Sequence, residues 1–262
     1  MTPKLACSTR GLMAQVLRSF PLAGGLEFIR QAGAAGVELY WSQVERAFAD
    51  QANPGRCLRD LLADKSLALT GINLPQFVGV DDGEDQPAAT KALCDHLACI
   101  AETGCASCNL FAYDRGEQGR EVLVRAVAAV AEAARPLGMS VNWANWRGTR
   151  IEQIEDLRYL VEAARAGNVR VLLDAAQFHA SAVNPLDVVA EFGDLVGCVH
   201  LGDCIGHRPV PVGQGEVNLG GVLRQARHAG YDGWFVIDFE VSGREDPLEG
   251  LAEALSHVQS LA

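Results

Sequence analysis

The sequence lacks an excess of basic residues, a long apolar run and any segment that resembles a linker. Among its 262 residues, 33 Asp and Glu outnumber 22 Lys and Arg, which gives a formal net charge of −11. Such a surface repels phosphate backbones and anionic membranes, so we expect neither a nucleic-acid partner nor a membrane partner. No run approaches the roughly 18 apolar residues of a membrane helix, and the first residues contain no stretch long enough for a signal peptide. These absences predict a cytoplasmic protein.

No low-complexity or Pro/Gly/Ser-rich tract divides the chain, and its 49% hydrophobic content is spread evenly from end to end. We therefore expect one domain over residues 1–262. This length is enough to bury a core without disulfides or metals, and it fits a single barrel of roughly 250 residues.

The eight cysteines are scattered through expected strands and helices, so reduced thiols are expected. The tightest group is Cys94, Cys99, Cys105 and Cys108, and a zinc or iron–sulfur site there is the alternative. Cys94 and Cys99 fall on nearly opposite faces of an expected helix, whereas ligands of one ion share a face. The spacing therefore disfavours a metal cluster.

Short apolar runs rich in Val, Ile and Leu alternate with longer helical patterns along the whole chain, an order typical of parallel strands joined by helical crossovers. We expect strands at residues 4–10, 36–41, 67–74, 107–113, 139–146, 169–176, 197–202 and 233–240. We expect helices at about 22–34, 54–64, 87–103, 120–136, 151–166, 185–192, 218–229 and 247–260. Eight such units favour a single closed (β/α)8 TIM barrel over an open doubly wound sheet, and no G-x-G-x-x-G follows the first strand.

Residues that typically begin or end helices support these ranges. Asn184 and Pro185 are expected to open a helix, and Gly138 and Gly167 to close one each. Gly230 is expected to do the same before the last strand.

Several apolar runs end abruptly in acidic or imidazole groups, which is how a buried barrel strand delivers side chains to an active-site rim. Asp174 ends the sixth run, His200 lies near the end of the seventh, and Asp238 lies near the end of the eighth. Period-two alternation puts Asp238 and Glu240 on one face of the last strand. These residues are the first candidates for a functional site.

Together these features resemble the xylose isomerase-like TIM barrel superfamily, the sugar phosphate isomerase/epimerase family, which also includes the type IV apurinic endonucleases. The matching features are residues 36–39, Asp174, His200 with Asp203, and residues 213–233, and they extend over essentially the whole chain. The resemblance implies a divalent metal held by Asp174, His200 and Asp238. One nitrogen and two oxygen ligands suit Mn, Mg, Co or Zn.

Some positions depart from the family pattern. The family's remaining ligand, a glutamate that ends the fifth strand, falls on Ala144, and Asp238 stands where the family usually has Glu. The family often has a His three residues after the Asp of the sixth strand, but this chain has Gln177 there and His179 two residues later. We expect weaker metal binding than with four ligands.

The resemblance implies an isomerase or epimerase, either a carbohydrate epimerase or an aldose–ketose isomerase. It would act on a small sugar, polyol or keto acid through metal-assisted proton transfer beside a carbonyl group. The catalytic candidates are Asp238, Glu240 and His179, and the substrate-binding candidates are Glu38, Trp146, Gln177 and Arg208.

An inward Trp146 would give an apolar wall for a sugar ring, and Arg208 would hold a substrate anion. Structural interpretations stay open for several of these residues. Asp203 could form a loop turn, Glu38 could be a hydrogen-bond partner, and His179, Arg208 and Glu240 could be solvated surface groups.

Other functions also stay open. The missing carboxylate at Ala144 motivates a metal-independent lyase, hydrolase or cyclase on the same barrel. A non-catalytic relative would bind its small-molecule ligand without turnover. DNA-strand cleavage is the least favoured, because the endonucleases need a trinuclear cluster rich in histidine and the chain has only six. The resemblance also leaves a homo-oligomer open, although no exposed stripe in the sequence demands one.

Overall fold

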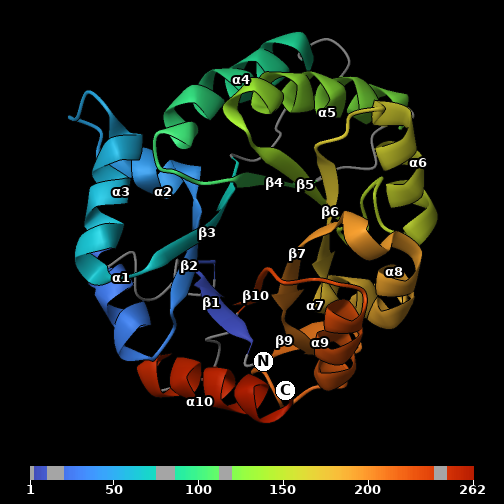
Figure 1. Ribbon diagram of the computed structural model, residues 1–262. Helices are drawn as coiled ribbons and strands as arrows, with labels where there is room; N and C mark the ends of the chain where they lie inside the picture. The colour runs from blue at the N-terminus through green and yellow to red at the C-terminus, as the bar shows by residue number, and fades with distance from the viewer. Residues whose placement is uncertain (1–2, 11–20, 75–85, 112–119, 239–246) are drawn as a thin grey trace.

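The computed structural model describes residues 3–10, 21–74, 86–111, 120–238 and 247–262. Eight parallel strands close into a barrel surrounded by helices, which confirms the predicted (β/α)8 TIM barrel (Figure 1). The order around the barrel is β1-β10-β7-β6-β5-β4-β3-β2. These strands are β1 (Lys4–Ser8), β2 (Gly36–Tyr40), β3 (Ala68–Asn73), β4 (Ser107–Phe111), β5 (Ser140–Ala144), β6 (Val169–Asp174), β7 (Val196–Leu201) and β10 (Trp234–Ile237).

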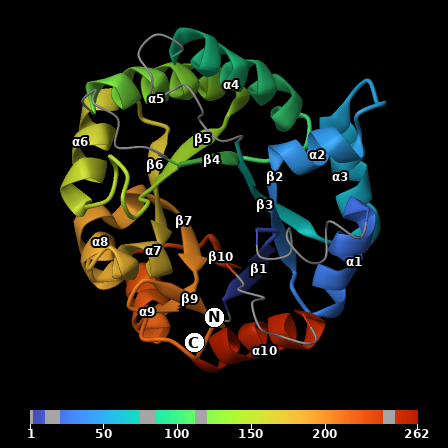
Figure 2. The same ribbon diagram turned by 180° about the vertical axis from the view of Figure 1, so that it is seen from behind.

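The helices that surround the barrel correspond to the expected ones and form a ring that is seen again from behind in Figure 2. They are α1 (Leu22–Gln31), α3 (Pro54–Lys65), α4 (Gln86–Ala101), α5 (Glu121–Ala134), α6 (Ile154–Ala164), α8 (Pro185–Phe192), α9 (Leu219–His228) and α10 (Pro247–Ser260). Two single 3-10 turns, Arg135–Leu137 and Gly193–Leu195, follow α5 and α8.

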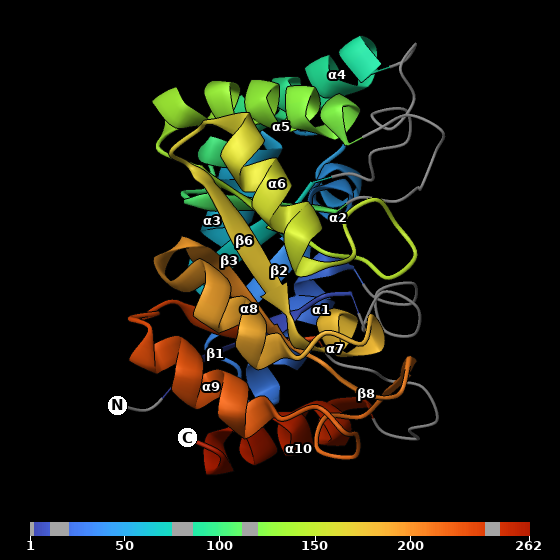
Figure 3. The same ribbon diagram turned by 90° about the vertical axis from the view of Figure 1, so that its right-hand side faces the viewer.

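Four short elements were not expected from the sequence. They are α2 (Trp41–Ala47), α7 (Ala175–Ala180) and the antiparallel pair β8 (Asp203–Ile205) and β9 (Arg208–Val210). Figure 3 shows α2, α7 and β8 at the end of the barrel opposite the two chain termini. The predicted strands at 36–41 and 169–176 end early because α2 and α7 begin directly after them. These elements therefore build the rim at the carboxyl ends of the strands.

The buried residues form two clusters that follow the period-two alternation of the strands. The larger cluster includes Leu5 and Cys7 of β1 and packs with the helices, so it lies between the barrel and the outer ring. The smaller cluster comes from alternate positions of six strands, which places it inside the barrel. Its members are Ala6, Phe111, Ala144, Leu172, Cys198 and Val236, with Trp146 and Trp234 packed against them.

Most of the residues predicted to begin or end a helix do so in the structure. The side chain of Asn184 caps α8 by accepting a hydrogen bond from the backbone of Leu186, with Pro185 in the first turn. Gly138 and Gly230 have φ values of 70° and 92°, which glycine adopts without strain. The prediction for Gly167 was wrong, because α6 ends at Ala164 and the left-handed residue is Arg165, with a φ of 49°.

All eight cysteines lie in the described residues and are free thiols, as expected. Seven belong to strands or helices, Cys105 lies between α4 and β4, and all eight are half-buried or buried. Along the described ranges, each helix is too short or too polar to cross a membrane.

Candidate active site

Four ionisable side chains meet inside the carboxyl end of the barrel. Glu38 comes from β2, Asp174 ends β6, His200 lies on β7, and Asp238 follows β10. Asp174 and His200 are directly paired across β6 and β7. Glu38, Asp174 and His200 are 0%, 1% and 3% exposed. Such burial of charged groups is costly unless each finds a partner, so their contacts decide what the site can do.

Glu38 is held by three hydrogen-bond donors. Asn73 Nδ2 donates to Oε1 at 2.8 Å, Asn109 Nδ2 donates to Oε2 at 2.8 Å, and His200 Nε2 lies 2.9 Å from Oε2. Burial opposes ionisation of Glu38, but the charge of His200 and these hydrogen bonds outweigh it, so the pKa of Glu38 is lowered. Burial likewise opposes the charge on His200, but Glu38 raises the pKa of His200 well above its ordinary value. The two residues form a buried ion pair.

A row of asparagines continues from this pair along neighbouring strands. Asn109 Nδ2 also donates to Asn73 Oδ1 at 2.9 Å, and Asn142 Nδ2 donates to Asn109 Oδ1 at 2.8 Å. Asn73, Asn109 and Asn142 are all at most 1% exposed. The sequence analysis did not identify Asn73 or Asn109. The signal was present, because asparagine is unfavourable inside an apolar strand unless its amide has partners there.

Asp174 has one satisfied and one unsatisfied oxygen. Its Oδ1 accepts a hydrogen bond from the backbone N–H of Gln177 at 3.0 Å and so caps α7. Its Oδ2 has no hydrogen-bond partner in the described part of the chain and lies 3.9 Å from His200 Nδ1. Burial and the negative charge of Asp238 raise the pKa of Asp174, while His200 and Arg10 oppose this rise. A buried acceptor without a partner is suited to receive a ligand or a proton.

The three residues predicted to hold a metal lie close together. Asp174, His200 and Asp238 each offer one ligand atom, and these atoms lie within 4.8 Å of one another. Because Nε2 of His200 faces Glu38, Nδ1 is the nitrogen that would bind an ion once it has lost its proton, an arrangement common for metal-bound histidine. The two oxygens and one nitrogen suit Mn, Mg, Co or Zn. The described residues fit a divalent metal at this position.

A second group, Glu38, Cys198 and His200, has ligand atoms equally close together. It is less suited to a metal because Glu38 already accepts hydrogen bonds from Asn73, Asn109 and His200. Burial also raises the pKa of the Cys198 thiol, which disfavours the thiolate that would bind an ion.

Arg10 also reaches the site, and the sequence analysis missed it. It lies two residues beyond β1, and its Nη1 is 3.1 Å from Asp238 Oδ2. Its guanidinium carbon lies 5.1 Å from the centre of the Trp146 ring. Trp146 in turn makes an edge contact with Phe111, with 6.1 Å between the ring centres. The mouth of the barrel therefore combines a cation with the aromatic rings of Trp146 and Phe111.

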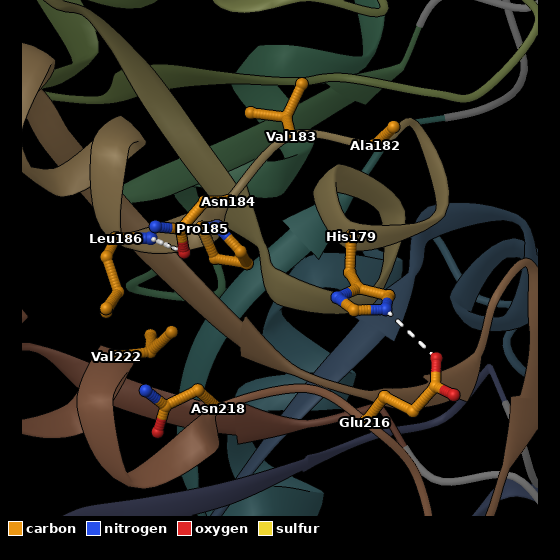
Figure 4. Close-up of a pocket in the computed structure, with 9 residues that line it drawn as sticks. All are labelled: His179, Ala182, Val183, Asn184, Pro185, Leu186, Glu216, Asn218 and Val222. Atoms are coloured by element: carbon orange, nitrogen blue, oxygen red, sulfur yellow. Dashed lines mark hydrogen bonds and ion pairs between the residues drawn. The ribbon is translucent and has the colours of Figure 1, made fainter.

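The remaining candidates lie farther out. Gln177, on α7, accepts a hydrogen bond through Oε1 from the backbone of Arg147 at 3.4 Å, beside the Trp146 loop. Arg208 is exposed on β9. His179 pairs with Glu216 at 3.5 Å and lines a surface pocket of about 520 Å³ between the start of α8 and the start of α9 (Figure 4). Glu240 lies outside the described residues.

Asp203 holds a loop together. Its carboxylate accepts hydrogen bonds from the backbone N–H groups of Cys204, Gly213, Gly215 and Val217 at 2.9 to 3.2 Å. This geometry agrees with the structural interpretation of Asp203. It fixes the connection that carries β8, β9 and Glu216.

A closed parallel barrel with buried carboxylates and a histidine at the carboxyl ends of its strands has the arrangement in which TIM-barrel enzymes build their active sites. The chain belongs to the xylose isomerase-like TIM barrel family, whose model matches residues 26–261. The family expected from the sequence is therefore confirmed.

Known relatives agree with this assignment. The Streptomyces coelicolor protein named "Putative hydroxypyruvate isomerase" is 26% identical over 237 residues, which cover 80% of this chain and 82% of that protein. The crystal structure of 3-keto-D-glucoside 4-epimerase from E. coli has a TM-score of 0.82 at 16% identity, with 98% of this chain and 99% of that chain covered. A structure of the IOLI protein with a bound zinc atom has a TM-score of 0.81 at 14% identity, with 97% of both chains covered. These two structures show the shared fold.

Proposed function

We propose that the protein is an isomerase or epimerase that moves a proton beside the carbonyl group of a small sugar, polyol or keto acid. The observation that carries this proposal is Asp174 Oδ2, a buried oxygen without a hydrogen-bond partner among the described residues, which lies beside His200. The names of the Streptomyces relative and the E. coli epimerase support the reaction class. A carboxylate that holds a metal ion in the site needs such an open oxygen.

A divalent ion held by Asp174, His200 and Asp238 would polarise the substrate carbonyl and stabilise the negative charge that develops on its oxygen. Asp238 has the most exposed side chain of the four ionisable residues, at 9%, so it can take a proton from the substrate and return it. Glu38 is fully buried, so it positions His200 through the 2.9 Å contact. Trp146 supplies an apolar wall against which a sugar carbon skeleton can pack.

Other proposed contacts depend on the rim. Gln177 lies beside the Trp146 loop and can donate its amide to a substrate hydroxyl. Arg208 lies on the β8–β9 hairpin, where it can meet an anionic substrate group. Glu240 stays a candidate second base, and His179 stays a candidate only for substrates that extend toward the pocket it lines.

Proton exchange with solvent tests the proposal directly. The protein is incubated with Mn²⁺ or Mg²⁺ and with hydroxypyruvate or a panel of ketoses in D₂O, and the protons beside the carbonyl are followed by NMR. We expect enzyme-dependent deuterium incorporation, lost in Asp174→Asn and retained in the matched control Asp60→Asn, an exposed aspartate on α3. Exchange at the same rate in both variants would contradict the assigned site.

A second candidate is a metal-independent lyase or related enzyme. Two observations favour it: Ala144 provides no carboxylate, and Arg10 already supplies a cation to Asp238. This candidate predicts loss of water or bond cleavage that is insensitive to a chelator. A ligand-binding relative without activity predicts saturable binding with no deuterium incorporation.

The proposal places the enzyme in the cytoplasm with a small molecule as its partner. Eight free thiols support a reducing compartment, and the net charge of −11 opposes binding to nucleic acid and to anionic membranes.

A further inference from the structure

The acidic site has a cation of its own. Glu38 and His200 neutralise each other as a buried pair, which leaves Asp174 and Asp238 as the carboxylates that can attract an ion. The guanidinium of Arg10 contacts one of these two, with Nη1 3.1 Å from Asp238 Oδ2. The side chain of Asp238 is 9% exposed and that of Arg10 is 33% exposed, so water screens this contact only in part.

Hydrogen bonds hold the backbone at Thr9 and Arg10, and an aromatic ring faces the guanidinium. The backbone N–H of Thr9 donates to the carbonyl oxygen of Glu38 at 2.9 Å, and the Thr9 hydroxyl donates to Gln43 at 2.7 Å. The backbone N–H of Arg10 donates to the hydroxyl of Ser8 at 3.3 Å. Trp146 faces the guanidinium from across the mouth. Arg10 is thus held where its charge acts on Asp238.

We propose that Arg10 competes with a divalent cation for the Asp238 carboxylate and so sets how tightly this site binds a metal. The inference rests on the metal site of the proposed function and does not depend on the reaction or the substrate. A metal ion must either displace the guanidinium from Asp238 or bind beside a positive charge. Both raise the free energy of the metal-bound state, because like charges repel strongly where water is scarce.

Arg10 also reduces the attraction of the site for cations in general. The carboxylates of Asp174 and Asp238 together carry two negative charges when ionised, and Arg10 offsets one of them. Replacing Arg10 by a neutral side chain restores the full attraction for a divalent ion. Replacing it by Lys keeps the charge and should keep most of the competition.

Titration of Mn²⁺ into the chelator-treated protein, followed by calorimetry and by the electron paramagnetic resonance of free Mn²⁺, measures this effect without any substrate. We expect Arg10→Gln to tighten Mn²⁺ binding by about tenfold or more, the change that corresponds to about 1.4 kcal/mol. Arg10→Lys should stay near the wild-type affinity. Arg56→Gln, which removes an exposed arginine paired with Glu102, should leave the affinity unchanged.

The partner of Arg10 is tested by combining variants. In an Asp238→Asn background, Arg10→Gln should no longer tighten Mn²⁺ binding, because the shared carboxylate is gone. An equal gain in both backgrounds would overturn the proposal. So would an unchanged or weaker affinity in Arg10→Gln, or no binding by wild type and Arg10→Gln at millimolar Mn²⁺.

A measurement on the wild-type protein guards against variants that fold poorly. Phenylglyoxal modifies accessible guanidinium groups, and peptide mass spectrometry locates the modified arginines. Saturating Mn²⁺ should increase modification of Arg10 and leave that of Arg56 unchanged. Unchanged or decreased modification of Arg10 would count against displacement from Asp238. Failure of the isomerase assay leaves both of these readouts intact, so the two proposals fail separately.

Discussion

Replacing Glu38 by Gln removes the negative charge that faces His200 inside the barrel. At 2.9 Å, with an effective dielectric constant of about 20, the attraction between the two charges is roughly 6 kcal/mol. The amide of Gln would also turn an N–H₂ group toward donors from Asn73, Asn109 or His200. His200 can respond by losing its proton, which limits the loss. We expect Glu38→Gln to lower the free energy of unfolding by about 3–5 kcal/mol.

Thermal unfolding in the presence of a chelator measures this change. For a protein of this size the loss corresponds to a melting temperature lower by about 6–20 °C. The matched control is Glu132→Gln, which removes an exposed glutamate paired with the exposed Arg135. Because that surface contact is well solvated, the control should melt close to the wild type. Equal melting temperatures for the two variants would refute the argument.

The pH dependence gives a further check with a defined sign. Glu38 has a lowered pKa in the folded protein, so its contribution is full above its ordinary value of 4.5 and is lost as the pH falls through the lowered value. His200 has a raised pKa, so its contribution is full below 6.5 and is lost as the pH rises through the raised value. The difference between wild type and Glu38→Gln should be largest between pH 4.5 and 6.5. A difference that grows at alkaline pH would contradict the ion pair.

Three other substitutions test separate parts of the site. Asp174→Asn keeps a cap for α7 but removes a buried charge. At pH values above the raised pKa of Asp174, the metal-free variant should therefore be more stable than the wild type by on the order of 1 kcal/mol. Calorimetry should show weaker Mn²⁺ binding by the same variant. Asp203→Ala leaves several backbone N–H groups without their acceptor, so the free energy of unfolding should fall by roughly 3 kcal/mol. Limited proteolysis should then cut first between residues 204 and 217. A loop that stays uncut would refute the role of Asp203. Ala144→Glu should tighten Mn²⁺ binding several-fold, and unchanged affinity would mean that Ala144 does not occupy the ligand position. The variant should also melt at a lower temperature, because the new carboxylate enters a fully buried cluster.

The fold could be predicted because a parallel barrel leaves a strong pattern in the sequence. Its strands are buried on both faces and appear as short apolar runs, and the crossover helices repeat with a different period. The short helices α2 and α7 were missed because they begin directly after their strands, at Trp41 and Ala175, with no intervening turn residues. For α7 a signal exists, since Asp174 is followed three residues later by Gln177, whose backbone it caps.

The candidate site could be predicted only in part. Strand ends supplied Asp174, His200 and Asp238, because parallel strands bring their carboxyl ends to one rim, although metal binding by them stays a prediction. The ion pair of Glu38 with His200 joins residues 162 positions apart, and the contact of Arg10 with Asp238 joins the two ends of the chain. Such pairs depend on how the barrel closes and on which rotamer each side chain adopts. The residue pattern of a single strand contains no information on either.

The asparagine row has an evolutionary consequence. Glu38 can only accept hydrogen bonds, so the amides of Asn73 and Asn109 must turn their N–H₂ groups toward it, and the carbonyl of Asn109 is then aimed at Asn142. Next to this row, a Cβ at Gly197 would collide with Asn142 Oδ1. A change at Glu38 or at one of the asparagines leaves a neighbouring N–H₂ group without an acceptor. A side chain larger than hydrogen at Gly197 leaves too little room for Asn142. Across homologous sequences these five residues should therefore be kept or lost as a group, and a lineage that has replaced Glu38 should carry compensating changes in the amides.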